Sequence, residues 1–134
     1  MKQLQAWLAS AVVLFCTTAT AAGQYEQPYG RVESGSRMQT QKQEPAAITK
    51  IDGKSTRDVR RSDPLAPGKH VVTVRFSSAR TVVAEQSQTI EVDVQPCKRY
   101  LIAASYESKV HGHWTPVVQA VEDIGECTRK FKLG

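Results

Sequence analysis

Alternation of apolar and polar residues is the clearest pattern in this chain. The run 71–76 reads Val-Val-Thr-Val-Arg-Phe, so Val72, Val74 and Phe76 share one face of an extended chain and the polar residues share the other. This period of two is typical of a strand that is buried on one side only. The pattern predicts a strand up to about residue 77, with one face in a hydrophobic core.

The same alternation predicts further strands. They are expected at 46–51, 54–59, 88–94, 99–107 and 114–124. The run 81–84 is either a short strand of its own or the extension of a hairpin. After residue 22 no segment has the period of a helix, so we expect at most a single helical turn and a basic tail, 128–134, that frays.

Two turn signals divide these strands. Asp52-Gly53 is typical of a tight turn between β-strands, and Pro67-Gly68 combines a fixed φ with a residue that tolerates positive φ. Several short strands separated by turns predict an all-β fold. We expect a single small antiparallel β-sandwich of about six or seven strands over residues 45–134.

The N-terminal segment 1–22 has the features of a secretory signal peptide. Lys2 is followed by an apolar run, 7–15, and by small residues at 19–21 that suit cleavage. A rival interpretation makes Cys16 the lipid-accepting cysteine of a bacterial lipoprotein, but Phe15 is bulky where such a site needs a small residue. No later segment approaches the length of about 18 apolar residues needed for a transmembrane helix.

Residues 23–44 are polar and lack apolar periodicity. Such a segment buries too little surface to offset its ordering entropy, so we expect a flexible linker. The alternative is a short docking motif formed by Tyr25 and Tyr29.

Two cysteines remain once Cys16 is removed with the signal peptide. An even number in an exported chain predicts a disulfide between Cys97 and Cys127. Geometry agrees, because a hairpin centred near residue 110 or 111 places position 97 opposite about position 124. Neither cysteine lies in a Cys-x-x-Cys motif, which disfavours redox catalysis and a structural zinc site.

The charge and the signal peptide together limit the partners. The formal net charge is +5 and the positive residues are scattered. A periplasmic or secreted location leaves an envelope protein or an anionic envelope polymer as partner, whereas nucleic acid is not expected there.

Candidate chemistry is sparse. His111 and His113 are spaced so that they can bind a divalent metal together with a third ligand, the alternative being two exposed turn residues. Glu122 and Asp123 are neighbours on a strand and point to opposite faces, which excludes the paired carboxylates of a glycosidase. No Gly-x-Ser-x-Gly motif and no phosphate-binding glycine loop occur. We therefore expect no catalytic residue, no cofactor and no enzymatic activity.

An aromatic platform for sugars is the other candidate site. It would use Trp114 with Tyr100 and Tyr106. The two tyrosines are in phase with the apolar residues of their own strand, which favours a place in or beside the core.

The turns carry a resemblance to a known family. Ile51-Asp52-Gly53, then Leu65-x-Pro67-Gly68-x-His70-x-Val72-x-Val74, and later Tyr100 resemble the PEGA-like β-sandwich modules of bacterial envelope proteins. The match covers about residues 46–107 and lacks the Pro-Glu-Gly-Ala motif itself. It implies an immunoglobulin-like or PEGA-like sandwich with a non-enzymatic envelope role and no catalytic residue.

The sequence thus yields three functional hypotheses. The first is an exported bacterial module that binds a partner or supports the cell envelope without catalysis. The others are a periplasmic metal-handling protein that uses His111 and His113, and a carbohydrate-binding module.

Overall fold

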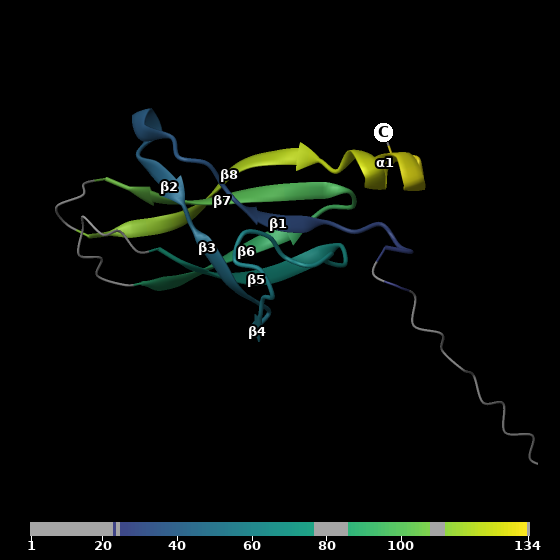
Figure 1. Cartoon of the computed structure of the whole chain (residues 1–134), viewed down its shortest axis with the longest axis horizontal. Helices are drawn as coiled ribbons and strands as arrows, with labels where there is room; N and C mark the ends of the chain where they lie inside the picture. Colours follow the sequence, from purple (N-terminus) through teal and green to yellow (C-terminus); the bar gives the residue numbers. More distant parts are fainter. Residues whose placement is uncertain (1–22, 24, 77–85, 108–111, 134) are drawn as a thin grey trace, which may run out of the picture.

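The computed structural model describes residues 23, 25–76, 86–107 and 112–133 (Figure 1). In this part of the chain the strands form two sheets, as the all-β prediction requires. The elements are β1 (Arg31–Ser34), η1 (Gln39–Gln41), β2 (Gln43–Pro45), β3 (Ala47–Ile51), β4 (Lys54–Ser55), β5 (Gly68–Arg75), β6 (Ser87–Val94), β7 (Lys98–Tyr106), β8 (Trp114–Asp123) and α1 (Gly125–Phe131). The predicted signal peptide with Cys16, and the run 81–84, lie outside the described residues.

The first sheet, here called the β5 sheet, has the strand order β4-β3-β5-β6, and its neighbouring strands are antiparallel. The turn between β3 and β4 is formed by Asp52 and Gly53, with φ of 50° and 80°. Two successive positive φ values fit a tight hairpin turn, which explains the Asp-Gly dipeptide. Gly68 begins β5 with a φ of 131°, a conformation that favours glycine.

The second sheet, the β7 sheet, is organised around β7. One edge of β7 pairs with two strands in succession, with β1 in parallel along its first half and with β2 antiparallel along its second half. Its other edge pairs with β8. The parallel β1–β7 pair is a departure from the purely antiparallel sandwich that we expected, and the described residues form eight strands instead of six or seven.

The β7–β8 hairpin has the predicted register at its open end. Lys98 pairs with Asp123, and beyond them the Ile124 N–H donates to the Cys97 carbonyl at 2.9 Å. Nearer the turn the register shifts by one residue between Leu101 and Ile102, so Gln119 of β8 is an additional, bulged residue. The Gln119 side chain contacts both the N–H and the carbonyl of Ser36, at 2.9 and 2.8 Å.

Part of the segment expected to be a flexible linker belongs to the fold. Val32 of β1 is fully buried, and Tyr29 is 5% exposed. The expectation of a linker up to residue 44 is therefore corrected. Backbone hydrogen bonds hold this segment: Cys97 donates to Tyr29, and β1 lies along β7. A strand of four residues with one core side chain is too short to show a period.

The C-terminal tail is also more ordered than expected. Residues 125–131 form α1, about two turns of helix. Cys127 is the buried residue of this helix, and its disulfide fixes the helix to the sandwich. The helix depends on this tertiary contact, since a segment of this length does not form a stable helix alone.

The core lies between the two sheets. Both sheets contribute to it, and the Phe76 and Trp114 rings meet at one end with their centroids 5.6 Å apart. Its buried members are Val32, Ala46, Ile48, Val72, Val74, Phe76, Val92, Val94, Tyr100, Ile102, Ala104 and Trp114. The predicted inward face of β5 is thus confirmed.

One side of the sandwich is closed by the segment 59–65. The Val59 carbonyl accepts from Ile48 of β3 at 2.8 Å, while Ser62 exchanges two hydrogen bonds with the Val32 backbone of β1. This segment therefore connects the edges of both sheets. Within the described residues, no helix is long and apolar enough to cross a membrane.

Candidate functional site

Both ring nitrogens of His70 have hydrogen-bond partners within the fold. It lies near the start of β5, and its side chain is 15% exposed. Its Nδ1 is 2.6 Å from Oδ2 of Asp52, and its Nε2 is 2.7 Å from the carbonyl oxygen of Ala66. Both ring nitrogens therefore face oxygen acceptors.

Asp52 organises the turn that holds His70. Its Oδ1 accepts a hydrogen bond from the Val71 N–H at 2.8 Å, and its own N–H donates to the Val71 carbonyl, also at 2.8 Å. Aspartate tolerates the left-handed conformation that this turn position needs. The carboxylate thus joins the β3–β4 turn to β5.

The pKa values of both groups follow from this arrangement. Burial lowers the pKa of His70, but the Ala66 carbonyl and the Asp52 carboxylate more than offset it, so the pKa is raised. The pKa of Asp52 is lowered, mainly by the Val71 N–H and then by His70. An imidazolium donates to both oxygens, whereas a neutral ring can donate to only one. Because both nitrogens are occupied, His70 is not free to bind a metal or to act as a general base.

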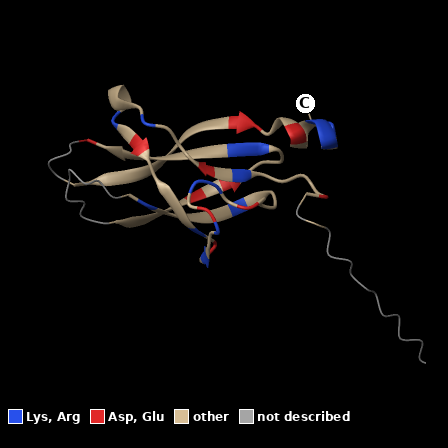
Figure 2. Ribbon diagram, in the orientation of Figure 1, with Lys and Arg blue, Asp and Glu red and all other residues tan. Residues whose placement is uncertain are grey.

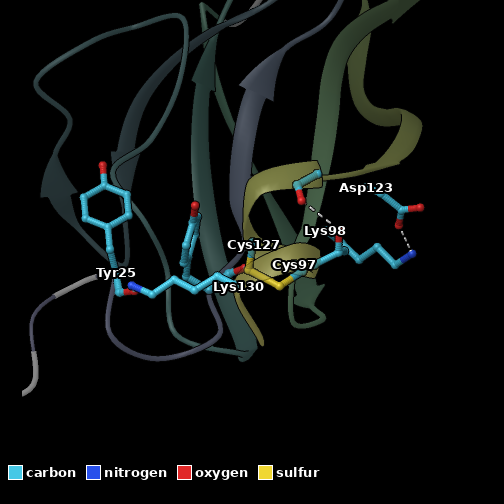
Figure 3. The surroundings of a disulfide bond; sticks show 9 residues. Tyr25, Cys97, Lys98, Asp123, Cys127 and Lys130 are labelled. Atoms are coloured by element: carbon cyan, nitrogen blue, oxygen red, sulfur yellow. Dashed lines mark hydrogen bonds and ion pairs between the residues drawn. A yellow bond between two sulfur atoms is a disulfide. The ribbon is translucent and has the colours of Figure 1, made fainter. Parts of the chain in front are cut away.

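The disulfide forms a second structural centre at the end of the sandwich that carries α1. Cys97 and Cys127 are joined, as the sequence predicts, and each is 1% exposed. A small cluster of Tyr29, Ile124 and Phe131 packs around them. Figure 3 shows the bridge beside the ion pair of Lys98 with Asp123. A disulfide without exposed sulfur is a structural crosslink, because exchange requires access to a thiolate.

The N-terminal segment is held against this centre. The Cys97 N–H donates to the Tyr29 carbonyl at 2.7 Å, and Lys130 of α1 donates to the Tyr25 carbonyl (Figure 3). The Arg31 guanidinium lies 6.0 and 5.6 Å from the ring centroids of Tyr25 and Tyr29. Tyr29 is therefore part of the fold, and only Tyr25, which is half exposed, is accessible for docking.

Only one of the two predicted metal ligands belongs to the described part of the chain. His113 is exposed and precedes β8, while His111 lies outside the described residues. Among the described residues, no group of three or more histidine, cysteine, aspartate or glutamate side chains is placed to hold a metal ion. The histidine pair remains a prediction.

The aromatic residues considered for sugar binding lie in or beside the core. Trp114 is 4% exposed and Tyr100 is 7% exposed. Tyr106 is partly buried and packs against the same core. These rings do not form an exposed platform.

Basic and acidic side chains form ion pairs at several places on the surface. Figure 2 shows basic and acidic residues interspersed along the ribbon. Arg99 contacts Glu122 at 2.9 Å, and Arg57 contacts Asp63 at 2.7 Å. Glu122 and Asp123 form ion pairs with Arg99 and Lys98 of β7, respectively.

Comparison with known proteins gives no relative for this chain: no protein family, curated protein or solved structure matches it.

The Asp52–His70 contact is the feature that the sequence did not reveal. Both residues belong to recognised turn signals, but their contact depends on the pairing of Ile51 with Val72. A histidine three residues after a proline of a turn, together with an upstream Asp-Gly, is the signal that identifies it in retrospect.

Proposed function

We propose that this chain is an exported bacterial protein of the cell envelope that acts by binding or by structural support, without catalysis. The buried disulfide carries the proposal. Disulfides persist in oxidising compartments, and this one crosslinks a small sandwich. The sandwich follows, in the sequence, a segment with the features of a signal peptide.

The contacts of the four candidate titratable side chains support a role without catalysis. His70 and Asp52 bind each other and the backbone, and Glu122 and Asp123 pair with cations of β7. General acid–base catalysis needs a titratable group within reach of substrate, and these four groups are engaged within the fold.

We also propose that the sandwich is PEGA-like. The two turns that carry the resemblance are in contact, because His70 of the Pro-Gly-x-His turn binds Asp52 of the Asp-Gly turn. In this proposal the histidine and the aspartate have a structural role.

Expression of the full-length chain in a bacterium tests export. We expect cleavage near residue 22, recovery from the periplasm or medium, and no free thiol when the unreduced protein is alkylated. A cytoplasmic protein that keeps residues 1–22, and with them Cys16, and that has three reactive thiols would overturn export. Substrate turnover that is lost on a point substitution would overturn the absence of catalysis, and crosslinking in intact cells would identify the partner.

A further inference from the structure

Strand β6 is the one long and regular sheet edge that nothing covers in the described part of the chain. At the opposite edge of the β5 sheet, β4 has only two residues. In the β7 sheet, segment 59–65 covers β1, while β8 contains Pro116, which lacks an N–H, and the bulge at Gln119. Short strands, covering loops, proline and bulges are four of the features that protect sheet edges from pairing, and charged side chains are another.

β6 has none of the first four features, and its charges, Glu91 and Asp93, repel acidic segments but not basic ones. It pairs with β5 over eight residues without a register shift, and it contains no proline. Just before the first residue of β6, the Gln86 carbonyl accepts a hydrogen bond from the Phe76 N–H at 2.9 Å. In an antiparallel pair, hydrogen-bonded and non-hydrogen-bonded residue pairs alternate, so this bond fixes which residues of β6 bond to β5. Even-numbered residues of β6 therefore bond to β5, and Thr89, Glu91 and Asp93 direct their N–H and carbonyl groups outward.

The opposite strand confirms this phase. Val71 pairs with Glu91, yet both Val71 backbone groups are bonded to Asp52 on the β3 side. Glu91 therefore receives no backbone hydrogen bond from β5. Outside the ladder, Thr89, Glu91 and Asp93 form no backbone–backbone hydrogen bond to another described segment. The phase of the ladder therefore leaves their peptide groups available at the edge.

The exposed edge is acidic. Glu91 and Asp93 lie on the outer face of the β5 sheet, and the Glu91 side chain is 61% exposed. Lys69 of β5 approaches Glu91 at 3.7 Å, while Asp93 has no ion pair within the described residues. Opposite charges on neighbouring strands stabilise a sheet and like charges destabilise it.

We propose that β6 binds an extended segment of a partner protein that carries basic residues at alternate positions, which adds to the β5 sheet as a fifth strand. The outward peptide groups bind its backbone, and Glu91 and Asp93 select its cationic side chains. A second copy of this chain fits less well, because an antiparallel β6 pair centred on Glu91 sets the two Glu91 carboxylates opposite each other. This inference rests on the binding function proposed above, and it identifies β6 as the binding site.

A blocked hexapeptide of alternating lysine and valine is the probe. It is titrated into the ¹⁵N-labelled, disulfide-bonded protein, and backbone amide shifts are followed by NMR. We expect saturable shifts and slowed amide exchange at Thr89, Glu91 and Asp93. The matched peptide with glutamate in place of lysine should produce neither effect, nor should a lysine peptide N-methylated along its binding edge.

Two variants separate the backbone contribution from the charge. Thr89→Pro removes an outward N–H without removing a bond to β5, so it should abolish binding, whereas Thr89→Ala should retain it. The double variant Glu91→Gln/Asp93→Asn should weaken binding of the lysine peptide by about 2- to 30-fold. This second variant tests the proposal even if Thr89→Pro does not fold.

Shifts centred on β8, an equal response to the glutamate peptide, or no response at millimolar peptide would overturn the inference. So would self-association through β6 in the absence of peptide. These outcomes leave the export and crosslinking experiments unaffected, so failure of the β6 site is distinguishable from failure of the proposed function.

Discussion

His70 and Asp52 form a short hydrogen bond, 2.6 Å from Nδ1 to Oδ2, that joins the start of β5 to the β3–β4 turn. The second ring nitrogen of His70 reaches the Ala66 carbonyl, so one side chain connects three segments. The three segments lie at one end of the β5 sheet, and the protonation state of a single imidazole determines whether both contacts persist.

The first prediction concerns pH. The pKa of His70 is raised in the folded protein, so its contribution to stability is complete below about pH 6.5 and is lost as the pH rises through the folded pKa. The pKa of Asp52 is lowered, so its contribution is present above about pH 3.8 and is lost as the pH falls through its folded pKa. Chemical denaturation should show the greatest contribution of the pair in the mildly acidic range between them.

The control is His70→Gln, which keeps a polar group but does not titrate. The free energy of unfolding of the native protein should fall relative to this variant between about pH 6 and pH 9. Parallel curves for the two proteins over this range would show that the His70 contacts do not depend on its proton.

The second prediction tests whether β1 belongs to the stable fold. Val32→Ala removes two methyl groups from a fully buried side chain and should lower the free energy of unfolding by about 2 kcal/mol. Val59→Ala is the matched control, because the Val59 side chain is 52% exposed, and it should have little effect. Urea denaturation compares the two, and equal effects would indicate that residues 31–34 are not packed.

The third prediction concerns the crosslink. The double variant Cys97→Ala/Cys127→Ala opens a loop of 30 residues, and chain entropy assigns the bridge about 3 to 4 kcal/mol. A matching fall in stability should be accompanied by faster amide exchange at Thr128, whose N–H bonds to Ile124 within α1. A variant with unchanged stability and unchanged exchange would show that the cluster around Tyr29 holds the helix without the bridge.

The fourth prediction concerns the close approach of the chain at Gly30. A Cβ there would lie 2.2 Å from Cγ1 of Val94 and 3.0 Å from the Lys98 carbonyl oxygen. Gly30→Ala should therefore destabilise the fold by about 1 to 3 kcal/mol, measured by urea denaturation. At Gly23 the nearest atoms to an added Cβ are 3.5 Å away, so Gly23→Ala should leave the denaturation midpoint in place.

Sequence patterns were sufficient for the strands that depend on their own alternation. β5, β6, β7 and β8 each have eight or more residues, so their extended pattern could be recognised in the sequence. The register was predicted only at the open end of the β7–β8 hairpin, and the shift between Leu101 and Ile102 was not. The approach of Cys97 to Cys127 followed from that register. For β1 and α1, stability comes from partners distant in sequence, and neither segment is long enough to carry a period of its own.

The candidate sites show the same division. Turn composition identified Asp52-Gly53 and Pro67-Gly68. The contact between Asp52 and His70, however, depends on how β3 pairs with β5. The exposed edge of β6 could not be predicted either, because an edge strand and a central strand can have the same alternation of apolar and polar residues. Which strand is left without a neighbour is decided by the whole topology.

The parallel pairing of β1 with β7 also has a consequence for the order of assembly. β1 is the first strand to be synthesised, yet its partner Tyr100 lies in the next-to-last strand. Val32 therefore stays exposed until nearly the whole chain has emerged, and contacts between such distant residues are slow to form. In the export proposed above, with the N-terminus crossing the membrane first, the leading end of this chain would therefore stay unfolded during most of its passage.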